Sequence, residues 1–257
     1  MCKKKFFIQL SYDGTAYHGW QIQPNASTVQ ETIEQALRVL SGEKVSTMGC
    51  GRTDTGVHAA DFYLHCELNL NQYNEDEFNY KLNHLLPDDI SVKRIFEVDA
   101  ALHARFSAVK REYRYYLYQQ KNPFLKHYCA YFSKQLDVQS MREAGKLLFK
   151  HKDFTSFSKS KTDTKTNDCT MLNFEINELP DGRLEFVIEA NRFLRNMVRS
   201  IVGTLLDVGT GKLDLTRFEQ IIVAKNRSKA GVSVPANGLF LSRVSYEKGA
   251  FEGQNNE

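Results

Sequence analysis

The chain contains little cysteine, little proline and a single tryptophan among its 257 residues. Its five cysteines form no C-x-x-C pair and their number is odd, so neither a disulfide framework nor a zinc site is expected. No apolar run approaches the length of a transmembrane helix, and residues 1–7 lack the core of a signal peptide. We therefore expect a cytoplasmic protein without a membrane partner.

An excess of charge of one sign is also absent, since the net charge is only +3. This balance does not by itself indicate a nucleic-acid partner, so local clusters must be considered instead. The seven histidines show no metal-ligand spacing, and no glycine-rich dinucleotide motif follows an expected strand. Gly209-Thr210-Gly211-Lys212 lacks the first glycine of a phosphate-binding loop and is expected to end a helix. We expect no metal and no nucleotide cofactor.

Residues 1–107 are expected to form one α+β half. Alternating or continuous apolar residues predict strands, and apolar residues at helical spacing predict helices. The expected elements are a strand over 6–12, a helix over 28–40, strands near 44–50 and 60–67, a helix over 75–86 and a strand over 90–98. The order β-α-β-β-α-β is the split βαβ arrangement.

Residues 108–248 are expected to form a second, related half. The expected elements are a strand over 111–119, a helix capped by Asp137, strands near 170–177 and 183–190, helices over 192–208 and from 214, and a last strand over 239–246. This is again β-α-β-β-α-β with one helix added. The polar stretch 159–168 is expected to be an exposed loop, and the tail 249–257 to be disordered.

The most unusual stretch is the glycine-rich segment 49–59, which joins two expected strands. It contains Arg52 and Asp54, and an arginine beside an aspartate in a partly enclosed loop holds the carboxylate ionised. This favours a catalytic carboxylate. The competing interpretation is an Asx-turn in which Asp54 only bonds its own backbone, and the spacing alone favours that simpler interpretation.

The expected strand over 111–119 alternates basic and aromatic residues. Tyr113, Tyr115 and Leu117 share one face, whereas Arg114, Tyr116 and Tyr118 share the other. This composition suits phosphate contact and base stacking, but it also suits an aromatic-rich strand with one solvated basic face. The strand alone does not decide between the two.

The expected helix over 192–208 has a broad apolar face and an opposite cluster formed by Arg192, Arg195 and Arg199. Arginine favours bidentate contact with a carboxylate or a phosphate. An ordinary amphipathic helix with a solvated basic face explains the same pattern, and for this helix alone it is the simpler explanation.

Several separate segments together resemble the tRNA pseudouridine synthase A family over nearly the whole chain. In chain order they are Tyr12-Asp13-Gly14-Thr15, Gly19-Trp20-Gln21, Gly51-Arg52-Thr53-Asp54, Gly56-Val57-His58-Ala59, His103-Ala104-Arg105-Phe106-Ser107-Ala108, Arg111-Glu112-Tyr113-Arg114-Tyr115, Met197-Val198-Arg199, Ile201-Val202-Gly203-Thr204-Leu205, Pro235-Ala236 and Gly238-Leu239. Cys50 and Thr55 stand where the family often has alanine, which is a mild departure.

The resemblance implies an α+β fold of two related, ferredoxin-like halves. Their mostly antiparallel sheets are expected to join side by side around a central basic cleft, in a homodimer that binds tRNA. The expected targets are uridines 38, 39 and 40 of the anticodon stem-loop. Such an isomerisation is redox-neutral and includes no hydrolysis, so it requires neither cofactor nor metal.

The resemblance also implies roles for particular residues. Asp54 is the expected nucleophile, and attack at C1′, attack at C6 and a glycal-like intermediate all stay open. Tyr113 is expected to pack on the target base and to assist the proton transfer from C5, and Arg199 to pair with Asp54. Arg52 is expected to fill the space left by the flipped nucleotide.

The remaining substrate-binding residues are expected to shape the pocket and to hold the RNA backbone. Leu239 or Leu241 would line the apolar side of the pocket, while Arg105, Arg111 and Arg195 would position phosphates.

Two other classes of function stay open at this stage. A catalytically silent RNA-binding protein would not need Asp54, Tyr113 and Arg199 together. A glycoside or nucleoside hydrolase usually has a pair of carboxylates, for which Asp13 or Asp61 could serve beside Asp54, but no motif places either of them.

Overall fold

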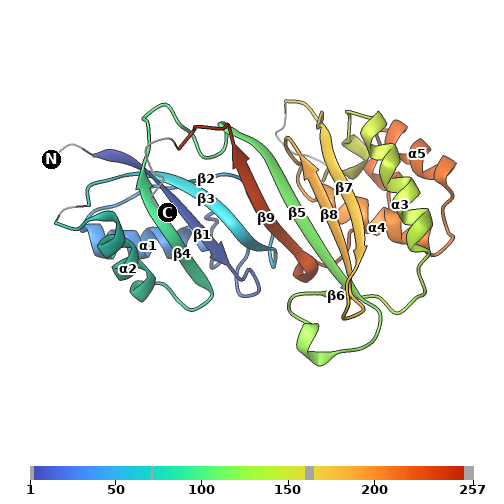
Figure 1. The fold of residues 1–257 in the computed structure, drawn as a ribbon, viewed down its shortest axis with the longest axis horizontal. Helices are drawn as coiled ribbons and strands as arrows, with labels where there is room; N and C mark the ends of the chain where they lie inside the picture. Colours follow the sequence, from blue (N-terminus) through green and yellow to red (C-terminus); the bar gives the residue numbers. More distant parts are fainter. Residues whose placement is uncertain (1–2, 71, 160–164, 252–257) are drawn as a thin grey trace. The chain divides into compact units, whose positions relative to one another are not determined.

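The computed structural model describes residues 3–70, 72–159 and 165–251 (Figure 1). The chain divides into two compact units, Met1–Val109 with Leu241–Glu257, and Lys110–Phe240. Both units combine helices with mostly antiparallel strands, so the expected α+β class is confirmed.

The first unit follows the expected β-α-β-β-α-β order. Its elements are β1 (Lys4–Tyr12), α1 (Val29–Ser41), β2 (Met48–Gly49), β3 (His58–Leu68), α2 (Glu75–Leu85) and β4 (Ile90–Glu97). Strand β1 lies between β4 and β3 and pairs antiparallel with both, while β2 pairs with β3. Strand β9 (Leu239–Tyr246) adjoins β3 on its other side, so the strand order is β4-β1-β3-β9.

The helices of this unit begin and end at residues suited to their termini. Thr28 caps α1 by accepting a hydrogen bond from the Glu31 amide at 3.3 Å, and Gly42 ends it in the left-handed conformation. Asn74 and Glu77 form a reciprocal capping box at the start of α2. Both helices bury their apolar faces, and α2 packs on β4.

The second unit has a smaller sheet with helices packed against it. Its elements are β5 (Ala108–Tyr118, from Lys110 onward in this unit), β6 (Ala130–Tyr131), α3 (Val138–Leu147), β7 (Met171–Glu178), β8 (Leu184–Ala190), α4 (Met197–Gly209) and α5 (Leu215–Val223). Strand β8 lies between β5 and β7 and is antiparallel to both, and the short β6 pairs parallel to β5. Helix α3 packs on β7, α4 and α5.

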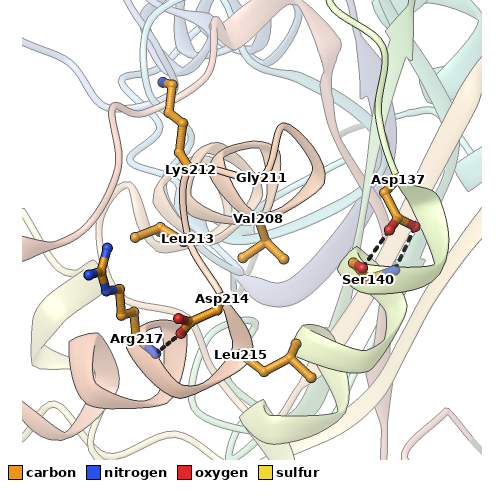
Figure 2. A pocket seen from close by; sticks show the side chains of 9 residues that line it. All are labelled: Asp137, Ser140, Val208, Gly211, Lys212, Leu213, Asp214, Leu215 and Arg217. Atoms are coloured by element: carbon orange, nitrogen blue, oxygen red, sulfur yellow. Dashed lines mark hydrogen bonds between the residues drawn. The ribbon is translucent and has the colours of Figure 1, made fainter.

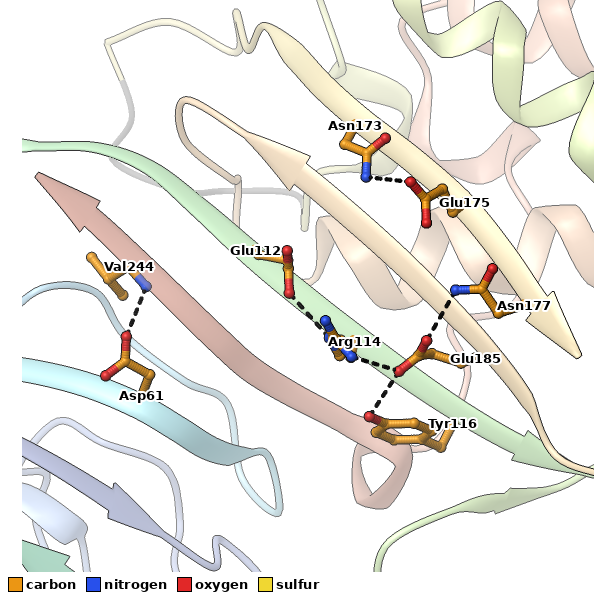
Figure 3. Close-up of polar contacts among 9 residues, drawn as sticks. All are labelled: Asp61, Glu112, Arg114, Tyr116, Asn173, Glu175, Asn177, Glu185 and Val244. Atoms are coloured by element: carbon orange, nitrogen blue, oxygen red, sulfur yellow. Dashed lines mark hydrogen bonds and ion pairs between the residues drawn. The ribbon is translucent and has the colours of Figure 1, made fainter. Parts of the chain in front are cut away.

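One face of the β5–β8–β7 sheet carries a network of charged and polar side chains (Figure 3). The Arg114 guanidinium donates to Glu112 and to Glu185, each at 3.0 Å. Tyr116 and Asn177 also donate to the Glu185 carboxylate. Because two carboxylates already compensate Arg114, this face is not a surface of uncompensated positive charge for phosphates.

Two sequence-based expectations are corrected. The helix expected from Arg192 begins at Met197, because Asn196 adopts the left-handed conformation with φ of 65° and cannot continue a right-handed helix. Arg192 and Arg195 therefore precede the helix, and the predicted cluster of three arginines on one helical face was wrong.

The last strand was expected within the second half, 108–248, but from Leu241 onward it belongs to the first unit. The physical reason is its contacts there: Val244 donates its amide to Asp61 of β3, and the Tyr246 ring packs edge-on against Phe7 and Tyr63. The expected disordered tail lies outside the described residues from 252 onward, as does part of the expected loop 159–168, namely 160–164.

A segment of extended chain, residues 231–235, crosses α4 at close range within the second unit. Thr204 accepts the Gly231 amide at 2.9 Å, and a Cβ added to Gly203 would come within 1.8 Å of the Val232 carbonyl oxygen. Further along, the Val234 amide donates to the Arg199 carbonyl at 3.1 Å. Gly203 is therefore required for the close approach of two backbones.

We predict that Gly203→Ala destabilises the protein even though alanine is the better helix former. Helix propensity alone would add about 1 kcal/mol of stability, whereas forcing a methyl group against a backbone carbonyl costs about 1–3 kcal/mol or more. Chemical denaturation of the two proteins should show a lower free energy of unfolding for the variant.

Ser200→Ala in the same helix is the matched control. The buried Ser200 hydroxyl has no hydrogen-bond partner among the described residues, so its removal should leave stability unchanged or raise it. An unchanged or higher stability for Gly203→Ala would contradict the close approach.

Candidate active site

Asp54 lies in the turn that connects β2 to β3, and its side chain is half-buried. The Val57 amide donates to the Asp54 carbonyl at 3.1 Å, and Gly56 takes the positive φ of 73° that this tight turn requires. The neighbouring Thr53 is buried, and its hydroxyl lies 2.8 Å from the Tyr12 hydroxyl at the end of β1. The backbone on both sides of Asp54 is thus fixed.

A distant segment, residues 13–20, wraps around this turn. Trp20 donates its amide to the Thr53 carbonyl, and Gly56 donates its amide to the Tyr17 carbonyl, both at 3.2 Å. A Cβ on Gly19 would come within 2.5 Å of the Thr53 carbonyl oxygen, and one on Gly14 within 2.0 Å of the Val57 carbonyl oxygen. The glycines of the two motif segments are therefore explained by one structural requirement, which is close backbone contact around Asp54.

His58, which follows the turn, contacts the start of the segment that wraps around it. It is buried, and its Nδ1 lies 3.1 Å from the Gly14 amide nitrogen and 3.0 Å from an Asp13 carboxylate oxygen. The Gly14 amide donates to this ring nitrogen. The Asp13 carboxylate also accepts from the Thr15 amide and hydroxyl.

Tyr113 and Tyr115 lie on the same face of β5 in the second unit. The half-buried Tyr113 ring meets Phe193 edge-on, with 5.0 Å between the ring centroids. Tyr115 is fully buried and donates its hydroxyl to the Pro235 carbonyl at 3.1 Å. Burial raises the pKa of Tyr115 well above its usual value, so the phenol stays protonated and keeps this hydrogen bond.

Arg199 occupies the first turn of α4 and is held by the same crossing segment. Its Nε donates to the Val234 carbonyl at 2.7 Å, while its own carbonyl accepts the Val234 amide. The neighbouring Asn196 side chain donates to the Ser233 hydroxyl at 2.6 Å. Fixing Nε orients the planar guanidinium, whose two terminal nitrogens carry further N–H donors suited to a carboxylate or a phosphate.

Arg105 lies in a tight turn built on two histidines. His65 Nδ1 accepts the Ala104 amide at 3.1 Å, and His103 Nδ1 accepts the amides of Arg105 and Phe106. Burial, together with the nearby His103 and Lys5, lowers the pKa of His65 to about 4, so the ring stays neutral and can accept. The exposed Arg105 guanidinium lies 5.7 Å from the Phe106 ring centroid.

The remaining predicted site residues fall into two groups. Arg52 and Arg195 are exposed, and Arg111 donates to the Asn191 carbonyl at 3.0 Å. Leu239 and Leu241 are buried and share one face of β9. Within the second unit, the adjacent carbonyls of Val234 and Pro235 accept from Arg199 and Tyr115.

Sequence reasoning missed the residues that hold the candidate side chains. Thr53, His58 and Tyr115 stood in the motif segments but were given no role, and Val234, which accepts from Arg199, was not named. Alternation along β5 placed Tyr115 on the same face as Tyr113, which was the available signal. No sequence signal predicts that an extended segment 35 residues beyond Arg199 supplies its backbone acceptor.

A pocket in the second unit lies away from the predicted site residues, at the N-terminal ends of α3 and α5 (Figure 2). Asp137 accepts the Ser140 amide at 3.0 Å and Asp214 accepts the Arg217 amide at 2.7 Å. These carboxylates occupy the positions at which helix N-termini bind anions, so the pocket is explained by helix capping.

The described residues contain neither a metal centre nor a membrane-spanning helix. No group of three or more His, Cys, Asp or Glu side chains there could hold a metal ion. No helix in the described part of the chain is long and apolar enough to cross a membrane.

The chain matches the family model described as tRNA pseudouridine synthase over residues 9–107 and 144–247. Asp54 and Arg199 lie inside these ranges, whereas Tyr113 lies between them. The chain also overlaps a solved structure of a Cbf5-Nop10-Gar1 complex with a TM-score of 0.36 at 10% identity, covering 93% of this chain and 59% of that one. A similarity of that size supports no conclusion.

Full-length relatives cover the whole candidate site. The chain is 47% identical to tRNA pseudouridine synthase A of Bacteroides fragilis, over 98% of this chain and 100% of that protein. It is 47% identical to the protein of the same name from Porphyromonas gingivalis, over 96% and 99%, and 45% identical to that of Bacillus subtilis, over 93% and 97%. This chain belongs to the tRNA pseudouridine synthase family.

Proposed function

We propose that this protein isomerises uridine to pseudouridine in tRNA, at positions 38, 39 and 40 of the anticodon stem-loop. The observation that supports it best is the Asp54 turn, whose glycines, buried threonine and buried histidine fix the backbone that bears this carboxylate of a family motif. The relatives named tRNA pseudouridine synthase A support tRNA as the substrate.

The reaction breaks the N1–C1′ bond, turns the uracil ring and joins C5 to C1′. The proton lost from C5 is balanced by one gained at N1, so no oxidant, reductant or water is consumed. Asp54 acts as the nucleophile at C1′ or C6, or it stabilises a glycal-like intermediate, and each route needs an ionised carboxylate. No step calls for a metal or an organic cofactor.

Tyr113 and Arg199 are proposed to complete the chemistry. The Tyr113 ring packs on the flipped uracil, and its hydroxyl assists removal of the C5 proton. Arg199 pairs with Asp54 and keeps it ionised. The terminal nitrogens of its guanidinium suit this role, because Nε is already committed to Val234. We propose that Arg52, Arg105, Arg111 and Arg195 hold the RNA, and that Leu239 or Leu241 lines the apolar side of the pocket.

The hydrolase alternative lacks support from the carboxylates that it would need. Asp13 accepts from Thr15, and Asp61 accepts the Gln9 side-chain amide at 2.6 Å and the Val244 amide at 3.3 Å. Both therefore have structural partners that explain their presence. A hydrolase would release free uracil, whereas the proposed reaction leaves the mass of the RNA unchanged.

We further propose that the protein works as a homodimer in the cytoplasm. The family resemblance suggests the dimer. Helix α5 packs on α3 and α4, so it does not cover the sheet face that carries Glu112 and Arg114. A partner chain could cover that face.

Asp54→Asn should abolish turnover while tRNA binding stays within about threefold. Loss of an essential carboxylate costs at least about a thousandfold in rate, whereas phosphate contacts supply most of the affinity. Carbodiimide mapping of pseudouridine on unmodified tRNA measures the first quantity, and filter binding measures the second. Asp61→Asn, which also neutralises a half-buried carboxylate, is the matched control and should retain activity. Turnover of Asp54→Asn within tenfold of the parent would remove Asp54 from this role.

Arg199→Ala should slow the chemical step by about a hundredfold or more and change the tRNA dissociation constant only a few-fold, because its proposed partner is Asp54. Single-turnover rates at saturating enzyme separate chemistry from binding. Arg195→Ala is the control, since this exposed arginine is proposed to contact phosphate and should affect binding and its salt dependence. A normal single-turnover rate with weakened binding in Arg199→Ala would reassign it to phosphate contact.

Light scattering at micromolar concentration should give a mass of about 59 kDa, twice the chain mass of 29.5 kDa. Full activity at the mass of one chain would show that a single chain suffices. When the measurement is repeated with tRNA bound, the mass of the RNA must be subtracted.

A further inference from the structure

The connection between β5 and β6, residues 119–129, is a surface that the proposed chemistry does not use. It lies beside β6 in the second unit and includes a short 3-10 turn, Pro123–Leu125 (Figure 1, green). We propose that this β5–β6 connection binds unpaired nucleotides of the tRNA substrate, with Phe124 stacking on a base. The proposal rests on the proposed function, because that function supplies the tRNA.

The charge of this region is of one sign. Between Glu112 and Asp137 the sequence contains no other acidic residue, although it contains Lys121, Lys126 and Lys134. All three lysines are exposed, and no carboxylate in the described part of the chain pairs with them. The region therefore differs from the neighbouring sheet face, where glutamates compensate Arg114.

Exposed aromatic rings accompany these lysines. Phe124 is 88% exposed, which makes it the most exposed large hydrophobic side chain in the described residues, and Tyr128 and Tyr131 are about half exposed. An aromatic ring left in water gains no burial energy from folding, so another reason for its position is needed. Lysines around exposed rings are the combination that binds single-stranded nucleic acid, through phosphate attraction and base stacking.

Hydrogen bonds fix the backbone of the β5–β6 connection around the exposed Phe124 side chain. Asn122 accepts the Phe124 amide at 3.0 Å, and Tyr128 donates its amide to the Leu125 carbonyl at 3.0 Å. The Asn237 side chain donates to the carbonyls of Lys126 and Cys129, at 2.7 and 3.0 Å. Preorganisation of this kind lowers the entropy that binding must overcome.

Asn237 also links the β5–β6 connection to the segment that holds Arg199. Asn237 follows two residues after Pro235, whose carbonyl accepts from Tyr115, and three after Val234, whose carbonyl accepts from Arg199. All of these residues belong to the second unit. RNA bound to the β5–β6 connection is therefore held in a fixed position relative to Arg199, so this surface sets which nucleotide reaches it.

RNA fits this surface better than a protein partner does. Lysine is depleted in protein–protein interfaces, whereas the stretch that carries these rings contains three lysines. A second copy of the chain docked here by two-fold symmetry would set lysines against lysines.

The test compares Phe124→Ala and the double variant Lys121→Ala/Lys126→Ala with the full-length parent, using unmodified tRNA. Phe124→Ala should raise the dissociation constant about five- to hundredfold, the range for losing one stacked base. The double variant should reduce the slope of log affinity against log salt by about 1.4. Single-turnover rates at saturating enzyme should stay within about threefold of the parent for both.

Matched controls are Phe149→Ala, a half-exposed aromatic elsewhere in the same unit, and Lys150→Ala/Lys152→Ala, two exposed lysines there. Phe124→Trp should restore binding, and because Trp20 is the only native tryptophan and is buried, tRNA should quench the fluorescence of the new one. Parent-like affinity of Phe124→Ala in an active enzyme would overturn the inference, and so would a lower mass in light scattering, which would make the connection a subunit contact. A parent that forms no pseudouridine in tRNA would instead overturn the proposed function.

Discussion

Close contact between two backbones is the constraint on which both Asp54 and Arg199 depend. Around Asp54, Gly14 and Gly19 let residues 13–20 lie directly against the turn, with carbonyl oxygens where a Cβ would otherwise be. Beneath Arg199, Gly203 admits the Val232 carbonyl in the same way. A backbone held by another backbone moves less than one held by flexible side chains, so the functional group that it bears stays in position.

Local patterns predicted much of the fold but not the places where a single residue interrupts a pattern. Periodicity and caps gave the order of elements in the first unit and the helix capped by Asp137. The apolar spacing of residues 193–206 also predicted a helix before Met197. The spacing of apolar residues does not reveal that a single residue, Asn196, adopts the left-handed conformation. Asn196 tolerates that conformation, and its side chain bonds Ser233, a partner 37 residues away that no local window contains.

The candidate site was predicted from family resemblance rather than from spacing. Spacing alone favoured an Asx-turn at Asp54 and a solvated face at Arg199, and these interpretations were reasonable because the supporting contacts are all long-range. Tyr12 reaches Thr53, Tyr17 reaches Gly56 and Val234 reaches Arg199, each across dozens of residues. Tertiary contact, which one sequence does not display, is what distinguishes a positioned side chain from an ordinary turn or helix.

The net charge of the chain is small, but its basic residues differ from region to region in whether acidic residues compensate them. Lys110 pairs with Glu189 and Arg114 with Glu112 and Glu185, so the basic residues of the β5–β8 face are already compensated. The stretch from Tyr115 to Leu136 contains basic residues and no acidic ones. Segregating charge in this way gives RNA a local attractive surface, while the net charge of the whole chain stays low enough to limit self-repulsion. The net charge of the whole chain averages over these two regions and therefore reveals neither of them.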